Sequence, residues 1–157
     1  MTKSLSGKYI TFVLDEEEFG INILNVQEII QKVKITKLPY NEAYVDGVIN
    51  LRGKVIPAID LRTKLGMERA EINDRNCIII VHSQHEGKII TAGLRVDSVS
   101  EVIDIKEEEI EEPTALIRQN PQAKAIVGMA KHKDAVKPLL EVDYLLDYKV
   151  IESISKA

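Results

Sequence analysis

Short runs of β-branched and aromatic residues, separated by turn-forming residues, recur along the chain. Residues 9–13, 78–81 and 89–94 are such runs, and their composition favours β-strands. Between residues 55 and 61 apolar side chains fall on both faces, as in a strand that is covered on two sides. The pair Arg52-Gly53 separates two apolar runs and predicts a tight turn. The pattern therefore predicts a protein built from strands.

Helices are predicted to be few. Residues 41–45 can form one short turn, and residues 61–65 another that ends at Gly66. Residues 143–155 carry apolar side chains at helical spacing after Asp143, a potential N-cap. The predicted class is all-β with minor helices, including one helix at the C-terminal end.

The chain contains an internal duplication. Residues 19–23 align with 92–96, and 26–30 with 99–103, at a constant offset of 73. Residues 47–57 align with 128–138 at an offset of 81, so the second copy has a longer connection, which we expect within residues 114–124. With about five short strands per copy, the duplication predicts a pair of small closed barrels that pack together.

Two features recur in the second part of each copy. Lys133-Asp134 falls where Arg52-Gly53 falls and predicts a second tight turn. Pro57 and Pro138 also coincide, each inside a strand pattern. Because proline cannot donate a main-chain hydrogen bond, both are expected at a strand edge or a bulge.

The composition argues against several classes of function and structure. The 157 residues carry a net charge of −4, no Trp, and seven Phe and Tyr residues without interleaved basic residues, which argues against nucleic-acid binding. Cys77 is the one cysteine, so an internal disulfide is impossible, as expected in a reducing compartment. No apolar run approaches the roughly 20 residues of a membrane helix. We expect a soluble, cytoplasmic protein.

The sequence predicts no catalytic, metal or cofactor site, so we expect that the protein is not an enzyme. His82 and His85 have the spacing of metal ligands, but a solvated turn between strands is the favoured interpretation. Cys77 lies among aliphatic residues, which do not stabilise a thiolate. The acidic run at residues 106–112 could bind a basic partner, although a solvated connection is favoured.

Arg52 stands out because it follows a strand at a tight turn, in Asn50-Leu51-Arg52-Gly53. A guanidinium projecting there can grip a carboxylate with two hydrogen bonds, which a lysine cannot do. The alternative is a surface arginine that only favours solubility, and the residues alone leave both interpretations open.

Residues 9–146 resemble the CheW family of bacterial chemotaxis coupling proteins. The sequence G-V-I-N-L-R-G followed by V-I-P-x-x-D-L is far more specific than a short motif. The resemblance implies two intertwined five-stranded SH3-like β-barrels with a C-terminal helix, in a single CheW-like domain at residues 8–148. We expect sub-barrel 1 at about residues 14–83, sub-barrel 2 at 9–13 plus 84–145, and the helix at 143–155. The motifs lie at residues 19–21, 26–30, 47–57, 60–62, 93–99, 128 and 138–146.

The resemblance also implies a function. Proteins of this family are scaffolds that couple the cytoplasmic tips of methyl-accepting chemoreceptors to the regulatory domain of the histidine kinase CheA, in arrays at the membrane. By motif match, a groove between the barrels contacts the receptor, and kinase contacts lie on the first barrel, with a further contact near Leu116. The implied receptor-binding residues are Ile23, Val26, Glu28, Arg52, Gly93, which shapes the second barrel, and Val102; the implied kinase-binding residues are Asp46, Gly47, Lys54 and Leu116.

Two other functions compete with this one. Small five-stranded barrels often bind oligonucleotides, but the acidic balance and the missing aromatic platform speak against that function. A small-molecule hydrolase is the other alternative, and the sequence offers no residues for it.

Overall fold

Tight turns with left-handed backbone join neighbouring strands. The structure, a computed structural model, describes residues 4–39 and 42–155. Both turn residues have positive φ in four hairpins, and this backbone matches the twist of the flanking strands. The predicted turns at residues 52–53 and 133–134 are confirmed. The four turns are Asp15-Glu16, Arg52-Gly53, Glu86-Gly87 and Lys133-Asp134.

Eleven strands and a few short helices form in the described residues. The strands are β1 (Gly7–Leu14), β2 (Glu17–Asn22), β3 (Val26–Gln31), β4 (Val45–Leu51), β5 (Lys54–Asp60), β6 (Cys77–His85), β7 (Lys88–Val96), β8 (Ser98–Ile105), β9 (Ile110–Glu111), β10 (Ile126–His132) and β11 (Ala135–Leu140). The helices are η1 (Ile23–Asn25), α1 (Leu61–Lys64), η2 (Glu107–Glu109), α2 (Ala115–Arg118), η3 (Pro121–Ala123), α3 (Val142–Leu145) and α4 (Tyr148–Ser155).

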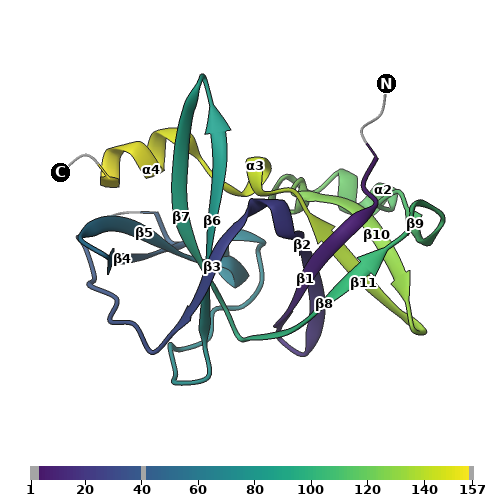
Figure 1. Cartoon of the computed structure of the whole chain (residues 1–157), viewed down its shortest axis with the longest axis horizontal. Helices are drawn as coiled ribbons and strands as arrows, with labels where there is room; N and C mark the ends of the chain where they lie inside the picture. Colours follow the sequence, from purple (N-terminus) through teal and green to yellow (C-terminus); the bar gives the residue numbers. More distant parts are fainter. Residues whose placement is uncertain (1–3, 40–41, 156–157) are drawn as a thin grey trace.

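The strands form two sheets that lie side by side (Figure 1). One has the order β3-β6-β7-β5-β4, and the other β8-β1-β2-β11-β10-β9. The chain beyond β3 returns to β4 through a bridge between Thr36 and Val48, which closes the first sheet into a barrel. The chain beyond β8 returns to β10 as β9, which closes the second. We call them the first and the second barrel, and they confirm the expected fold.

Strand pairing follows the duplication residue by residue. In the first barrel β5 runs parallel to β7, beginning with Ala58 opposite Gly93. In the second barrel β11 runs parallel to β2, beginning with Leu139 opposite Gly20. These pairs are related by the offsets of 81 and 73. Each barrel thus combines strands of both copies, so the barrels are intertwined.

The division of strands between the barrels differs from the expected boundaries. β2 was expected in sub-barrel 1 (14–83), but it pairs with β1 and β11 in the second barrel. β7 was expected in sub-barrel 2 (84–145), but it pairs with β6 and β5 in the first barrel. The reason is local: a two-residue turn keeps both strands of a hairpin in one sheet.

The two prolines occupy equivalent edge positions. Pro57 pairs with Val48 on β4, and Pro138 pairs with Met129 on β10. The parallel pairing of β5 and of β11 with their other neighbours begins one residue later. Each proline therefore stands where its strand has a neighbour on one side only, as predicted.

The main hydrophobic core is shared by both barrels. Phe12 and Ile21 of the second barrel and Ile79 and Leu94 of the first are fully buried in one cluster. Burying such side chains contributes about 1.5–3 kcal/mol each. Each barrel also has a smaller buried cluster of its own, so packing the barrels together adds to the cores that they have separately.

The C-terminal helix differs in detail from its prediction. Residues 143–155 form two helices, α3 and α4, and Asp147 caps the second by accepting hydrogen bonds from the main-chain N–H of Lys149 (3.0 Å) and Val150 (3.3 Å). The predicted cap, Asp143, instead accepts a hydrogen bond from Ser83. α1 ends at Lys64, and Gly66 (φ +80°) follows its C-cap residue Leu65, so the helix stops before Gly66 as predicted. A turn precedes β4, but Asn41 lies outside the described residues.

Candidate functional site

Arg52 and Glu28 form an ion pair at the surface of the first barrel. The side chain of Asn50 accepts a hydrogen bond from the N–H of Gly53 (2.8 Å), which fixes the turn that carries Arg52. Arg52 Nη2 lies 2.6 Å from Glu28 Oε2, and this hydrogen bond raises the pKa of the guanidinium. The side chain of Arg52 is 67% exposed and that of Glu28 26%.

The second carboxylate oxygen of Glu28 does not take part in the ion pair with Arg52. This oxygen, Oε1, is buried and has no hydrogen-bond partner among the described residues. An unpaired buried acceptor costs free energy. The exposed guanidinium of Arg52 thus lies beside a carboxylate whose second oxygen is buried.

Ile23 and Val26 lie where the chain crosses from the second barrel to the first. Ile23 begins η1, which connects β2 to β3, and Val26 begins β3 opposite Val81. Both side chains are half-buried. Leu24, between them in sequence, is 80% exposed and was not singled out by sequence reasoning. The crossing therefore presents aliphatic surface beside Glu28.

The other two residues expected to bind the receptor lie elsewhere. Val102 is on β8 of the second barrel and is 53% exposed. Gly93, expected to shape the second barrel, is buried in β7 of the first, which corrects that expectation. A Cβ on Gly93 would come within 2.6 Å of Ile78 Cγ2. Gly93 therefore serves interior packing and presents no side chain to a partner.

Asp46, expected to contact a kinase, is buried in a network of charges. Arg95 Nε donates to Asp46 Oδ2 at 2.6 Å, and both side chains are almost fully buried. Arg69 bonds to Asp46 as well, and also approaches Asp60 Oδ2 at 3.3 Å. Asp46 is thus a structural ion-pair residue and not a surface contact. Sequence reasoning missed this network, whose signal is a charged residue inside the apolar run of β7.

Gly47 is fixed by a close approach of two segments. Its φ is +145°, and a Cβ would lie 2.1 Å from the carbonyl oxygen of Thr36. The N–H groups of Thr36 and Val48 bond to each other's carbonyl oxygens across this contact, at 2.8 and 2.9 Å. Gly47 is buried and therefore acts by allowing barrel closure, not by touching a partner.

Lys54 and Leu116 are exposed but lie on different barrels. Lys54 begins β5 beside the turn that carries Arg52. Leu116 lies on α2, in the insertion between β9 and β10, and is 80% exposed. The structure therefore brings Lys54 near Arg52 and Glu28, while Leu116 and Val102 belong to the second barrel.

An ion pair ties the barrels together. Arg62 of α1 donates from Nε to Asp97 Oδ1 at 2.9 Å, and Asp97 also accepts from the N–H of Asp15 at 2.9 Å. Burial would raise the pKa of Asp97, but the bonds from Arg62 and Asp15 outweigh it, so the pKa lies below its ordinary value. Asp97 thus joins the β1–β2 turn to α1, which fixes the relative position of the two barrels.

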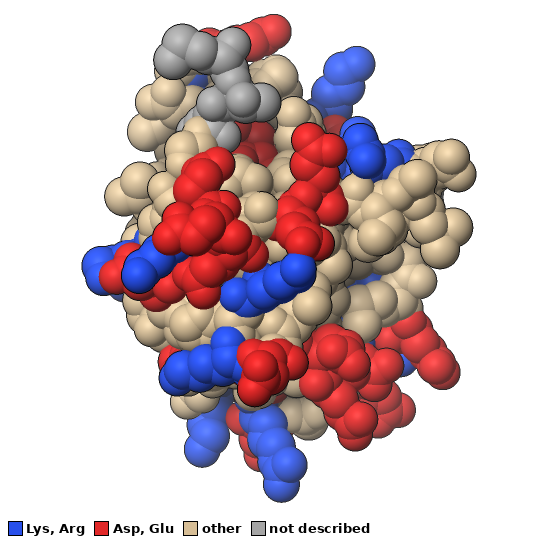
Figure 2. All heavy atoms as spheres, turned by 90° about the vertical axis from the view of Figure 1, so that its right-hand side faces the viewer, with Lys and Arg blue, Asp and Glu red and all other residues tan. Residues whose placement is uncertain are grey.

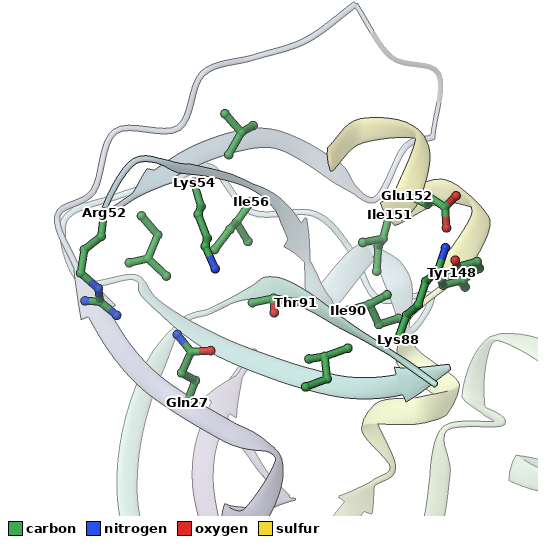
Figure 3. A pocket seen from close by; sticks show the side chains of 13 residues that line it. Gln27, Arg52, Lys54, Ile56, Lys88, Ile90, Thr91, Tyr148, Ile151 and Glu152 are labelled. Atoms are coloured by element: carbon green, nitrogen blue, oxygen red, sulfur yellow. The ribbon is translucent and has the colours of Figure 1, made fainter. Parts of the chain in front are cut away.

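A cavity of about 570 Å³ opens beside Arg52. We call it the β5–β7 cleft because β5 and β7 form its two sides. Figure 3 shows Arg52 and Gln27 at one end and Tyr148, Ile151 and Glu152 of α4 at the other. Sequence reasoning did not identify this cleft, because its walls come from separate strands and α4.

The histidines and the cysteine are in structural settings. His82 and His85 lie in β6, and the turn itself is Glu86-Gly87, which corrects the expected turn position of the histidines. The ring of His85 stacks on Tyr148 with centroids 4.2 Å apart. Cys77 is buried. No group of three or more His, Cys, Asp or Glu side chains in the described ranges could hold a metal ion.

The acidic run is structured. Its residues form η2 and β9, and β9 pairs with β10. Glu109 Oε2 lies 3.6 Å from His132 Nδ1, and Glu111 forms an ion pair with Lys131. The face of the molecule on the right of Figure 1, where β9 and β10 lie, displays clustered Asp and Glu side chains (Figure 2). Most of the run is exposed, as expected of a solvated connection, and part of it is paired with basic side chains of the second barrel.

Comparisons with known proteins agree on one family. The family described as CheW-like domain matches residues 8–150. The chain is 33% identical over 139 residues to the chemotaxis protein CheW of Helicobacter pylori, covering 88% of this chain and 81% of that one. It is 36% identical over 136 residues to a probable chemotaxis protein CheW of Rhizobium etli, covering 87% and 84%.

A solved structure extends the similarity to three dimensions. The crystal structure of the scaffolding protein TtCheW from Thermoanaerobacter tengcongensis superimposes with a TM-score of 0.77 at 36% identity, covering 91% of this chain and 94% of that chain.

Among the described residues, every helix is too short or too polar to span a membrane.

Proposed function

This chain belongs to the CheW family, and from that premise we propose that it is a chemotaxis scaffold that couples chemoreceptors to the histidine kinase CheA. Relatives that share most of its length are chemotaxis proteins CheW, and the similar solved structure is described as a scaffolding protein. Binding to receptor tips would recruit the protein from the cytoplasm to arrays at the membrane. A scaffold needs docking surfaces and no reaction centre.

The observation that carries the proposal is the Arg52–Glu28 pair beside aliphatic surface. Arg52 is exposed at a tight turn, and Glu28 Oε1 is buried without a hydrogen-bond partner in the part of the chain that the structure describes. Val26 and Ile23 lie close by in sequence at the crossing between the barrels. Such a surface suits an amphipathic receptor helix, because aliphatic residues bury its apolar face while the charged pair fixes its register.

Val102 extends the proposed receptor surface onto the second barrel. It is exposed on β8, the strand that the duplication relates to β3. A receptor helix in the groove between the barrels would then contact β3 on one side and β8 on the other. Gly93 contributes only by keeping β7 closely packed in the first barrel.

Kinase contacts are proposed at two places. Lys54 is exposed at the start of β5 on the first barrel, and Leu116 is exposed on the second. Asp46 and Gly47 support the first place from the interior by holding β4 in position. Two separate contact places would let one molecule join two kinase domains or neighbouring scaffold molecules in an array.

The experiment is a pull-down of this protein with a receptor signalling fragment. The Arg52→Asp variant should bind at least about tenfold more weakly, because a like charge then faces Glu28 and the donor fork is lost. Lys133→Asp is the matched control, since Lys133 occupies the equivalent turn of the second barrel. Unchanged binding by the Arg52→Asp variant would remove Arg52 from the receptor surface.

A further inference from the structure

The β5–β7 cleft exists because two parallel strands separate. β5 and β7 pair from Ala58 opposite Gly93 to Asp60 opposite Arg95. Before these pairs, residues 54–57 of β5 and 88–92 of β7 have no pairing with each other. The cavity of about 570 Å³ lies between these separated ends and is lined by both. The cleft is thus a gap in a sheet, with α4 at one end (Figure 3).

The β7 side of this gap is a free strand edge. β7 pairs with β6 along its whole length, with His85 opposite Lys88 next to the two-residue turn and Gln84 opposite Ile89. Beside such a turn the first residue pair exchanges main-chain hydrogen bonds, the second pair does not, and this alternation continues along the strands. The main-chain N–H and C=O groups of Ile89 and Thr91 therefore point away from β6, toward the cleft. The β7 edge can accept another strand.

The β5 edge of the gap is less able to pair with an added strand. The same alternation, counted from the Arg52-Gly53 turn, directs the main chain of Val55 and Pro57 toward the cleft. Pro57 has no N–H to donate. An added strand would therefore pair with β7 and not with β5.

The second barrel provides an internal comparison. There the equivalent strands, β11 and β2, also separate before Leu139 and Gly20. The gap is bridged by Lys137, 5% exposed, whose Nζ lies 2.9 Å from Glu18 Oε2. By the offsets of 81 and 73, the equivalent residues in the first barrel are Ile56 and Thr91, which cannot form an ion pair. In the second barrel a salt bridge fills this gap, whereas in the first barrel the gap is open.

The open gap has an apolar floor and a basic rim. Val55 is 48% exposed and Ile89 66%, although both are aliphatic. Lys54 and Lys88 line the cleft from its two sides, and Arg52 lies at one end. The hydroxyl of Tyr148 is hydrogen-bonded to the carboxylate of Glu152, which raises the pKa of that hydroxyl. The lining of the cleft carries three basic side chains against this one carboxylate. Charge complementarity therefore favours an acidic occupant.

We propose that the β5–β7 cleft binds an extended, acidic segment of a partner protein, which adds as a strand to the free edge of β7. Alternate apolar side chains of the segment would cover Val55 and Ile89, while its carboxylates meet Lys54 and Lys88. Main-chain hydrogen bonds to Ile89 and Thr91 give such strand addition its affinity, and side-chain contacts give it specificity. This inference does not depend on the proposed coupling of receptor and kinase.

The test uses the full chain and a capped nonapeptide in which valine alternates with glutamate. We expect saturable binding by calorimetry and slower amide hydrogen exchange at Ile89 and Thr91, by about tenfold or more, because a new hydrogen bond protects each amide. Lys88→Glu should weaken binding by about tenfold. Lys133→Glu, on the equivalent region of the second barrel, should leave binding unchanged.

A second variant transfers the salt bridge of the second barrel into the cleft. Ile56→Lys combined with Thr91→Glu should abolish peptide binding while the far-ultraviolet circular dichroism spectrum is retained. Absence of saturable binding up to about 1 mM, a range of weak affinity, would overturn the proposal. So would equal binding of the matched peptide in which lysine replaces glutamate, or binding that leaves Ile89 and Thr91 unprotected. If Ile56→Lys with Thr91→Glu does not fold, the Lys88→Glu result decides.

Discussion

Replacing Arg95 by methionine should destabilise the fold more than any surface charge substitution. Arg95 is 3% exposed and bonds to Asp46 through Nε (2.6 Å) and Nη2 (3.4 Å). Its Nη1 also donates to Asn76 Oδ1 at 3.1 Å, and Nη2 to the carbonyl oxygen of Ala70 at 3.3 Å. Methionine fills a similar volume but satisfies none of these acceptors. The loop that precedes β6 would lose the two hydrogen bonds that join Ala70 and Asn76 to Arg95.

The magnitude follows from the burial of Asp46. Removing one partner of a buried ion pair costs about 3–5 kcal/mol, because the other charge is left uncompensated. Arg69 still contacts both Asp46 and Asp60 in the variant. We therefore expect a loss at the low end of this range, about 3 kcal/mol. A domain of this size has about 5–15 kcal/mol of stability, so the variant should still fold.

Urea denaturation followed by circular dichroism measures this loss. The matched control is Lys8→Met, because Lys8 and Asp104 form an ion pair at 3.0 Å with side chains 62% and 69% exposed. That substitution should cost at most about 1 kcal/mol. If Arg95→Met cost no more than the control, the assignment of Asp46 and Arg95 as a structural network would be refuted.

Two further predictions concern the joint between the barrels and the closure of the first barrel. Asp97→Asn should cost about 1 kcal/mol of stability at neutral pH, a figure reduced for solvent screening. The folded-state pKa of Asp97 is lowered, so the carboxylate stabilises the fold above its unfolded pKa, and this contribution is lost as the pH falls through the folded pKa. The stabilities of variant and wild type, measured by urea denaturation, should therefore converge in acid. Gly47→Ala should cost about 3 kcal/mol of stability, because a Cβ at φ +145° would lie 2.1 Å from the carbonyl oxygen of Thr36. Gly53→Ala is the control: its φ is +86° and a Cβ there would have no heavy atom within 4 Å, so it should cost about 1 kcal/mol in the same assay. Equal costs would contradict the close-contact explanation.

The duplication could be predicted from the sequence because glycine and proline mark fixed places in the fold. Gly20 and Gly93 begin the two parallel pairings, and Pro57 and Pro138 stand at the two equivalent edges. What the residues did not predict is the exchange of hairpins between the copies. A strand's neighbour across a parallel pairing is far away in sequence, and the local pattern of apolar residues is the same for either neighbour.

The candidate site was predicted less completely than the fold. Arg52 could be singled out because it follows a strand at a tight turn, whereas Glu28 was implied only by the family resemblance; the two side chains meet in the structure. Asp46 was expected to contact a kinase because of the family resemblance; its burial could not be predicted, because its partner Arg95 is 49 positions away in sequence. The β5–β7 cleft could not be predicted, since it arises from strand separation and not from any motif.

The most direct test of the scaffold function is the kinase activity of CheA, mixed with receptor signalling fragments in the presence and absence of this protein. We predict that the protein increases phosphorylation several-fold in the ternary mixture, and that the Arg52→Asp variant does so much less. Kinase activity that is the same with and without the protein, under conditions in which all three components sediment together, would contradict the coupling role.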